Sequence, residues 1–159
     1  MDTTSSYTVT EATRKAERYC VYQERCHQEV IAKLQSMRMI PEAIDVILVH
    51  LIEHNFLNET RFAASFARGK HRIKYWGKIR IVRELKMRGI SEYNIKQGLK
   101  EIDLDSYIEH FNNLAVRHWE NMREKSKLVK RKKFCDFLLR KGFESDLIYA
   151  KVKKLEGSK

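Results

Sequence analysis

A six-residue apolar pattern occurs three times in this chain of 159 residues, at shifts of 51 and then 53 residues. Within each copy, two segments carry apolar residues at spacings of three, four and seven, which place them on one face of a helix. A period near 50 residues predicts stacked helical units, because each apolar stripe is too small to be buried alone. The aligned positions are Val30, Ile31, Leu34, Ile44, Leu48 and Leu51, then Ile81, Val82, Leu85, Ile95, Leu99 and Ile102, then Phe134, Cys135, Leu138, Ile148, Val152 and Leu155.

Turn-forming residues separate the two helices of each copy. Gly89 and Gly142 follow their helices at the position where a left-handed residue ends a helix, a conformation that glycine adopts at low cost. Arg38 stands at this position in the first copy, so we expect its turn to be built differently. Pro41 suits the first turn of the next helix, and Ser91 can cap the matching helix of the second copy.

A further helical stretch precedes each pair, over roughly residues 11–23, 58–71 and 105–123. The predicted fold class is therefore all-α, with three tandem three-helix repeats packed into an elongated, curved body. Six glycines and one proline leave little for hairpins or long loops, which agrees with this prediction. The expected organisation is a disordered tail at 1–10, repeats at 11–55, 56–104 and 105–156, and a frayed end at 157–159.

Composition limits the location and chemistry of the protein. No run approaches the roughly 18 apolar residues that a membrane span requires, and residues 1–10 lack the features of a signal peptide. We therefore expect a soluble, cytoplasmic protein. Cys20, Cys26 and Cys135 are odd in number and are expected to be reduced thiols. We expect a monomer, because no heptad stripe is left over once the repeat core is assigned.

The formal net charge of +11 is unevenly distributed. Residues 1–60 contain six Lys/Arg and nine Asp/Glu, net −3; residues 61–102 contain twelve and three, net +9; residues 103–159 contain fourteen and nine, net +5. This asymmetry indicates an anionic partner, with nucleic acid first and an acidic protein surface second.

The densest basic segment surrounds the sequence Tyr75-Trp76-Gly77. Cations along one helix can neutralise successive phosphates or pair with carboxylates. The two aromatic rings could stack on bases, but we favour packing at the junction between repeats, which is usual beside a glycine at a helix start. The candidate contact residues here are Arg61, Arg68, Lys70, Arg72, Lys74, Lys78, Arg80, Arg83 and Lys86.

A second basic cluster precedes the core pair of the third copy. Four consecutive cations cannot share one helix face, so some of them are simply solvated. A contact role and a solvated surface are equally supported at this point. The cluster comprises Lys125, Lys127, Lys130, Arg131, Lys132 and Lys133.

Two apparent metal motifs are weak. His50, Glu53 and His54 fit the H-x-x-E-H pattern of inverted zinc peptidases, but Leu51 between them is a repeat core position. Cys20, Cys26 and His27 do not have the spacing of a recognised zinc finger. With no phosphate-binding loop or nucleophile elbow either, we expect no metal, no cofactor and no catalytic residues, hence a binding protein and not an enzyme.

Three runs resemble the RecX family of bacterial recombination regulators: residues 56–63, residues 75–91, and Phe134 to Leu139 with Arg140-Lys141-Gly142-Phe143. The similarity covers about residues 11–155, although Asn58 stands where an Asp is more usual. The resemblance implies three tandem three-helix units and a RecA recombinase filament on single-stranded DNA as the partner, bound in its helical groove. It also implies inhibition of ATP hydrolysis, strand exchange and filament extension.

Residues of the family motif are expected to build the units, while the neighbouring cations are our candidates for contact. Inhibition could arise by bridging protomers or by blocking the groove where duplex DNA enters, and both remain open. The alternative function is direct DNA binding by helix pairs that act as helix-turn-helix elements. The expected structural residues are Phe56, Leu57, Asn58, Phe62, Trp76, Gly77, Leu85, Gly89 and Gly142.

Overall fold

In the computed structural model, which describes residues 6–157, the chain forms nine helices and no strand within that range. They form three units: α1–α3, α4–α6 and α7–α9. The bounds are α1 (Val9–Tyr22), α2 (His27–Ser36), α3 (Pro41–Glu53), α4 (Glu59–Lys74), α5 (Lys78–Met87), α6 (Glu92–Leu99), α7 (Leu104–Asn121), α8 (Lys127–Lys141) and α9 (Ser145–Gly157).

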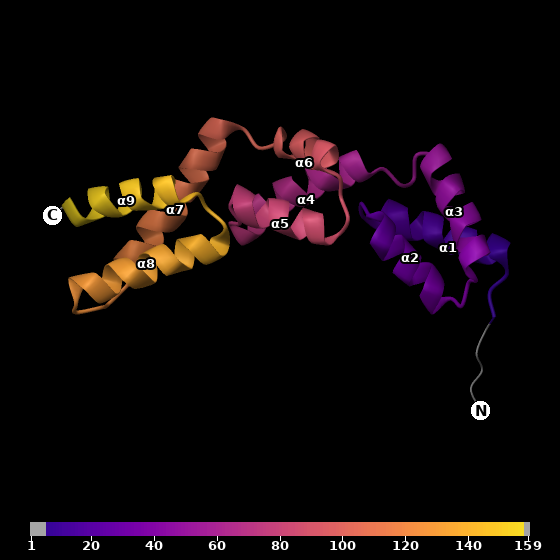
Figure 1. The fold of residues 1–159 in the computed structure, drawn as a ribbon, viewed down its shortest axis with the longest axis horizontal. Coiled ribbons are helices and arrows are strands. Elements are labelled where there is room, and N and C mark those ends of the chain that lie inside the picture. Colours follow the sequence, from indigo (N-terminus) through magenta and orange to yellow (C-terminus); the bar gives the residue numbers. More distant parts are fainter. Residues whose placement is uncertain (1–5, 158–159) are drawn as a thin grey trace, which may run out of the picture.

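The three units follow one another along an elongated body, with the first unit at one end and the third at the other (Figure 1). The prediction of an all-α fold of three tandem three-helix repeats is therefore confirmed. Each unit presents its second and third helices as the pair that the repeated apolar pattern marks. No helix within residues 6–157 has the length and apolar character needed to cross a bilayer.

The predicted ends need correction. Helix α1 begins at Val9, inside the predicted disordered tail, because the Thr8 side chain accepts a hydrogen bond from the N–H of Glu11 and so caps the helix. Residues 1–5 of that tail lie outside the described residues. At the other end, Gly157 belongs to α9, and residues 158–159 lie outside the description. Helix α7 begins at Leu104, one residue before the predicted boundary.

The turns inside the three units share one geometry. Gly89 and Gly142 have φ of 76° and 95°, as predicted, but Arg38 also has a positive φ of 61°. The expectation of a different turn at Arg38 is wrong. In each turn the residue after the left-handed position donates a backbone hydrogen bond across the helix end, as from Met39 to Leu34, and this bond requires the left-handed conformation.

Helix starts follow the predicted chemistry. Pro41 occupies the first turn of α3, where its missing N–H has no intrahelical partner to lose. The Ser91 side chain caps α6 by accepting a hydrogen bond from the N–H of Asn94 at 3.1 Å. A proline thus begins the second helix of the first pair, and a serine cap begins that of the second pair.

The apolar residues form two cores. The first unit has its own, which includes Val30, Leu34 and Leu51. The second and third units share a larger one. Its fully buried members include Ile81, Leu85, Phe134, Leu138 and Phe143. The second and third units therefore fold as one body, to which the first unit is joined.

Two residues cross between these cores. Cys26 of the first unit is fully buried in the shared core, and Leu57 is buried in the first core with Phe56 packed against it. We expected Phe56 and Leu57 to build the second unit, and this is corrected. Both donate backbone hydrogen bonds to the carbonyl of Leu51, at 2.8 and 3.1 Å, and this closes the end of α3 over the first core.

A backbone seam fixes the second unit against the third. The N–H of Gly77 donates to the carbonyl of Lys141 at 2.7 Å, and the N–H of Ile79 donates to the carbonyl of Gly142 at 3.0 Å. A Cβ on Gly77 would lie 2.3 Å from the Gly142 oxygen, and one on Gly142 would lie 2.2 Å from the Cβ of Arg80. Both glycines are therefore required by close approach.

Candidate binding surface

Four residues of the basic segment around Tyr75-Trp76-Gly77 are exposed without any ion pair in the part of the chain that the structure describes: Arg72 and Lys74, near the end of α4, and Arg83 and Lys86 on α5. The last two lie on the outward side of α5, whose inner side carries Ile81 and Leu85 into the core. Because their charges are not compensated within the fold, these residues are the most available for an anionic partner.

Four other residues among the predicted contact residues lie over aromatic rings. Arg80 and Lys70 lie 4.2 and 5.1 Å from the centre of the Trp76 ring. Rings hold such cations in place without neutralising their charge. The remaining pairs are Lys78 over Tyr107 at 4.7 Å and Lys130 over Trp119 at 3.9 Å.

Of the aromatic pair at the entrance of α5, Tyr75 packs at the junction between units, as favoured from the sequence, whereas Trp76 contacts residues of its own unit. Tyr75 stacks on His110 of the third unit, with ring centres 3.9 Å apart, and Arg117 lies over its ring. Trp76 packs edge-on against Phe66. Base stacking would therefore have to displace contacts that join the second and third units.

The seam gathers four cations from two distant segments, which we call the seam cluster: Lys74, Arg80, Arg140 and Lys141. The Nζ of Lys141 donates to the carbonyl of Lys74 at 3.0 Å, and Nη1 of Arg80 donates to the carbonyl of Arg140 at 3.1 Å. Burial, Arg80 and Lys74 together lower the pKa of Lys141 from its usual value. No carboxylate within residues 6–157 pairs with these four groups, so an added anion is electrostatically favoured here.

The sequence did not indicate Arg140, Lys141 or Arg117 as contact residues. The basic dipeptide before Gly142 is a local signal, but it gains meaning only when the Gly77–Gly142 contact brings it beside Lys74 and Arg80. Tertiary contact, not spacing in the sequence, assembles the seam cluster.

Arg61 has a structural role. Its Nε lies 2.5 Å from Glu24 of the first unit, and its other nitrogens donate to the carbonyls of Asn55 and Phe56. Guanidinium and carboxylate thus fasten the segment that joins the first unit to the second. With its donors used in this way, Arg61 is unavailable to a partner.

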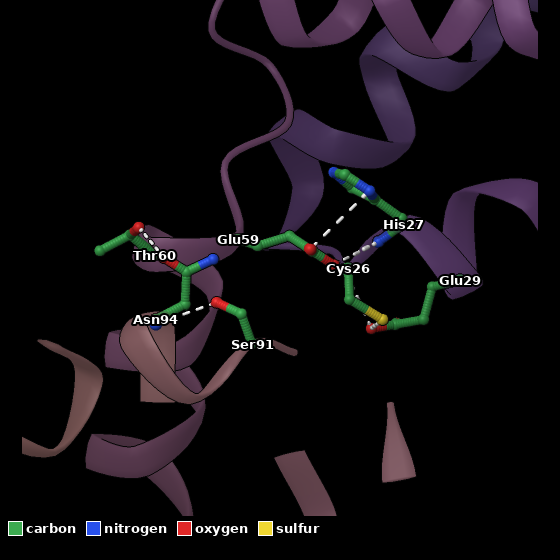
Figure 2. A network of polar contacts seen from close by, with 7 residues as sticks. All are labelled: Cys26, His27, Glu29, Glu59, Thr60, Ser91 and Asn94. Atoms are coloured by element: carbon green, nitrogen blue, oxygen red, sulfur yellow. Dashed lines mark hydrogen bonds and ion pairs between the residues drawn. The ribbon is translucent and has the colours of Figure 1, made fainter. Parts of the chain in front are cut away.

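A polar network lies at the same junction (Figure 2). The N–H of His27 donates to Glu59 across the junction at 3.1 Å, and within the second unit Thr60 donates to Asn94 at 2.7 Å. Beside it, the Cys26 thiol donates to Glu29 at 3.3 Å, and burial raises the pKa of this thiol to about 11. This thiol is therefore held protonated and serves packing instead of reactivity.

Three of the six residues of the second basic cluster are paired with carboxylates. Arg131 bonds to Glu156 through both Nε and Nη2, whereas Lys132 pairs with Asp136 and Lys133 with Glu124. Lys130 is the member held over Trp119. These pairs are exposed and weak, so a polyanion can compete for the cations, but their charge is already offset.

Arg68 and Arg72 border a cleft of about 330 Å³ between α4 and α7. Carboxylates also line this cleft, and Arg68 already lies 3.6 Å from Glu101. The mixed charge does not favour a single phosphate. The other carboxylates are Asp103 and Glu109.

Two imidazoles, those of His71 and His110, line this cleft. His71 is 4% exposed, its Nδ1 bonds the carbonyl of Trp76, and its ring centre lies 4.6 Å from that of His110. Burial lowers the pKa of both histidines, and neighbouring cations add to the effect. Burial also raises the pKa of Tyr107, whose hydroxyl donates to Glu144. Neutral side chains therefore hold this part of the seam.

The candidate metal ligands do not converge within the described residues. Nε2 of His50 faces Glu17 at 3.4 Å, and His54 bonds the backbone carbonyl of His50. In residues 6–157, no three His, Cys, Asp or Glu side chains are grouped so that they could hold an ion.

Comparison with known proteins places these units in a family. The model of the second three-helix domain of RecX matches residues 58–99, and that of the third matches residues 105–152. Regulatory protein RecX of Enterococcus faecalis (strain ATCC 700802 / V583) is 30% identical over 144 residues, which are 91% of this chain and 53% of that protein. Regulatory protein RecX of Bacillus subtilis (strain 168) is 27% identical over 139 residues, 85% of this chain and 51% of that protein.

The crystal structure of RecX from Lactobacillus salivarius matches the fold with a TM-score of 0.78 and 26% identity. The match covers 93% of this chain and 96% of that chain. By contrast, the chain spans about half the length of the curated relatives it matches.

Proposed function

Because the chain belongs to the RecX family of regulatory proteins, we propose that it is a non-enzymatic modulator of the RecA filament on single-stranded DNA. It binds along the helical groove of the filament and inhibits ATP hydrolysis, strand exchange and filament extension. Such a partner places its action in the cytoplasm. The supporting observation is an elongated body in which two fused units carry unpaired cations and the first unit is acidic.

The uncompensated cations are suited to the polyanionic part of such a filament. Arg72, Arg83 and Lys86 are exposed, and the seam cluster adds four further charges, none of which pairs with a carboxylate within residues 6–157. Arginine and lysine side chains of this kind bind phosphates by releasing the counterions of the nucleic acid. The second and third units therefore supply the contact with DNA.

Inhibition follows if the bound protein prefers one state of the filament. A ligand that spans neighbouring protomers, or occupies the groove, stabilises the state it binds and slows the cycle through the others. The fused second and third units favour such an effect, because their shared core resists deformation. Bridging of protomers and blocking of the groove are the two forms of this mechanism.

The test is the ATPase of RecA on single-stranded DNA, titrated with wild type and with Arg83→Glu/Lys86→Glu. Both side chains are exposed on α5, so this variant keeps the fold. Arg14→Glu/Arg18→Glu on α1 is the matched control, with the same charge change on another exposed helix face. We expect inhibition by wild type and control and at least tenfold weaker inhibition by the α5 variant. Absence of inhibition by folded wild type at severalfold excess would overturn the proposal.

Direct DNA binding is the second candidate, supported by the same unpaired cations. It requires tight binding to naked DNA, with affinity that falls with salt by a logarithmic slope of roughly 0.7–0.9 per neutralised phosphate. A filament modulator instead binds the RecA–DNA complex much more tightly than DNA alone. Fluorescence anisotropy with labelled single strands, with and without RecA, separates the two.

A further inference from the structure

The outward face of α3 is apolar, which is unusual for a surface helix. Val46, Val49 and Ile52 are 64%, 52% and 47% exposed. Their spacing of three residues places them along one side of the helix, while Ile44, Ile47 and Leu51 on the other side are buried in the first core. The stripe runs six residue steps along the helix, from Val46 to Ile52, and is therefore about 9 Å long.

The repeat itself provides an internal comparison. Shifts of 51 and then 53 residues carry Val46, Val49 and Ile52 onto the corresponding positions of the other units. Packing of a unit therefore does not require apolar side chains here, because two units of the same architecture do without them. The equivalent residues are Gln97, Lys100 and Asp103 in the second unit and Ala150, Lys153 and Glu156 in the third.

Three carboxylates frame this stripe. Glu42, Asp45 and Glu53 lie at helical spacings of three and four from the exposed valines, and all three are exposed. None of them forms an ion pair with any residue between 6 and 157. The surrounding segment is also acidic, with a net charge of −3 over residues 1–60. Nucleic acid is therefore repelled from this face, whereas a cationic segment is attracted.

We propose that the outward face of α3 is a protein-docking surface for a basic amphipathic segment, a short stretch with apolar side chains on one side and Lys or Arg at its flanks. Apolar side chains of the segment cover Val46, Val49 and Ile52, and its cations pair with the three carboxylates. This is the common mode in which one amphipathic element recognises another. The inference rests on the proposed function, since it assigns the segment to RecA itself.

The position of this face allows protein and DNA to be bound at different places on the molecule. Helix α3 lies in the unit at one end of the body, away from the seam cluster between the second and third units (Figure 1). One end then holds protein while the rest holds the DNA phosphates. Two linked contacts raise the overall affinity through effective concentration, and the pair selects a filament over DNA or recombinase alone.

The test replaces the stripe with the residues of the second unit: Val46→Gln/Val49→Lys/Ile52→Asp. This graft preserves net charge, and its side chains already occupy equivalent positions in the same fold. The matched control is Val21→Gln/Tyr22→Gln, which also preserves net charge and removes two exposed apolar side chains from the end of α1 in the same unit. Circular dichroism and thermal melting establish that both variants are folded.

Binding is measured by anisotropy against two probes, the RecA filament on single-stranded DNA and the same DNA alone. We expect the graft to bind the filament at least tenfold more weakly than wild type and to bind DNA within twofold of wild type. The control should match wild type on both probes. A second variant, Glu42→Lys/Asp45→Lys, should weaken filament binding to a similar degree while strengthening DNA binding.

Each alternative outcome overturns a distinct statement. Filament binding by the graft within twofold of wild type overturns the docking surface and leaves the proposed function intact. Equal loss in graft and control overturns its assignment to α3. Failure of wild type to bind the filament overturns the proposed function, and this inference with it. If light scattering shows wild-type dimers that the graft abolishes without loss of filament affinity, the face is a contact between copies and the proposal is overturned.

Discussion

Two glycines inside helices of the second unit have opposite environments. A Cβ on Gly98 of α6 would lie 2.7 Å from the carbonyl carbon of Ala63 on α4, whereas one on Gly69 of α4 would have nothing within 4 Å. Gly98 therefore permits the close contact of α4 with α6, and Gly69 carries only the cost of glycine in a helix.

We expect Gly98→Ala to lower the free energy of unfolding by about 1–3 kcal/mol, because the added methyl overpacks the contact with Ala63. Gly69→Ala should raise it by roughly 0.5–1 kcal/mol, because alanine reduces the entropy lost on helix formation. Urea denaturation of the two variants measures both values. Stabilisation by Gly98→Ala would show that α4 and α6 can separate freely.

A buried imidazole, His71, and a half-buried one, His110, make stability dependent on pH. Burial lowers the pKa of His71 and His110 in the folded state, so the unfolded chain binds more protons as the pH falls through about 6.5. The contribution of the neutral histidines is complete above that pH and is lost below it. Around the pair lie Lys78, Arg72 and Arg117, which disfavour a further positive charge.

We therefore expect the urea midpoint to be lower at pH 5.5 than at pH 7.5. In His110→Gln the difference between the two midpoints should shrink, because one of the protonation sites is gone. The same pair of midpoints measured in His118→Gln provides a comparison, because burial also lowers the pKa of this other histidine of the third unit. A midpoint that rises on acidification of wild type would contradict the assignment.

The seam between α4–α5 and the turn after α8 depends on two glycines that touch through their backbones. Gly77→Ala would place a methyl 2.3 Å from the Gly142 oxygen, and no side-chain rotation relieves a clash with backbone. We expect a loss of about 3 kcal/mol in the free energy of unfolding. Chemical denaturation checks this, with Gly69→Ala as the tolerated control. A loss below about 0.5 kcal/mol would mean that the two units can shift apart without cost.

The helices and their pairing could be predicted from sequence because apolar spacing and turn residues are local signals. The left-handed backbone conformation of Arg38 was missed, because an arginine in the sequence does not show that the hydrogen bonds at a helix end require a positive φ at its position. Leu57 was assigned to the wrong core and the burial of Cys26 in the shared core was not predicted, because helical periodicity does not say which neighbour a side chain meets.

The candidate site was only partly accessible from sequence. Clustering predicted a basic second unit, but it did not distinguish Arg61, which is bonded to Glu24, from Arg83, which has no ion pair within residues 6–157. Nor could spacing place Arg140 and Lys141 beside Lys74, a contact that links residues 67 positions apart in the case of Lys141. Charge pairing and long-range contact need coordinates.

Because the first unit has its own core, we expect it to unfold locally and separately from the second and third units. Its buried cluster is smaller than the shared one, and it is joined to the second unit by the buried Cys26 and by the pairs Arg61–Glu24 and His27–Glu59. We expect hydrogen exchange to show amides of α1–α3 opening at lower free energy than those of α5 and α8. Native-state exchange by mass spectrometry measures this. Equal protection across all three units would show one cooperative body.

The backbone character of the seam also bears on how such a protein can diversify. Gly77 and Lys141 are joined through main-chain atoms, so the lysine side chain at that position can be exchanged without removing that hydrogen bond. The surrounding surface can then drift in sequence while the relative placement of the two units is inherited unchanged. Substitutions on this surface can therefore change what it binds, whereas Gly77 and Gly142 cannot be replaced without a clash.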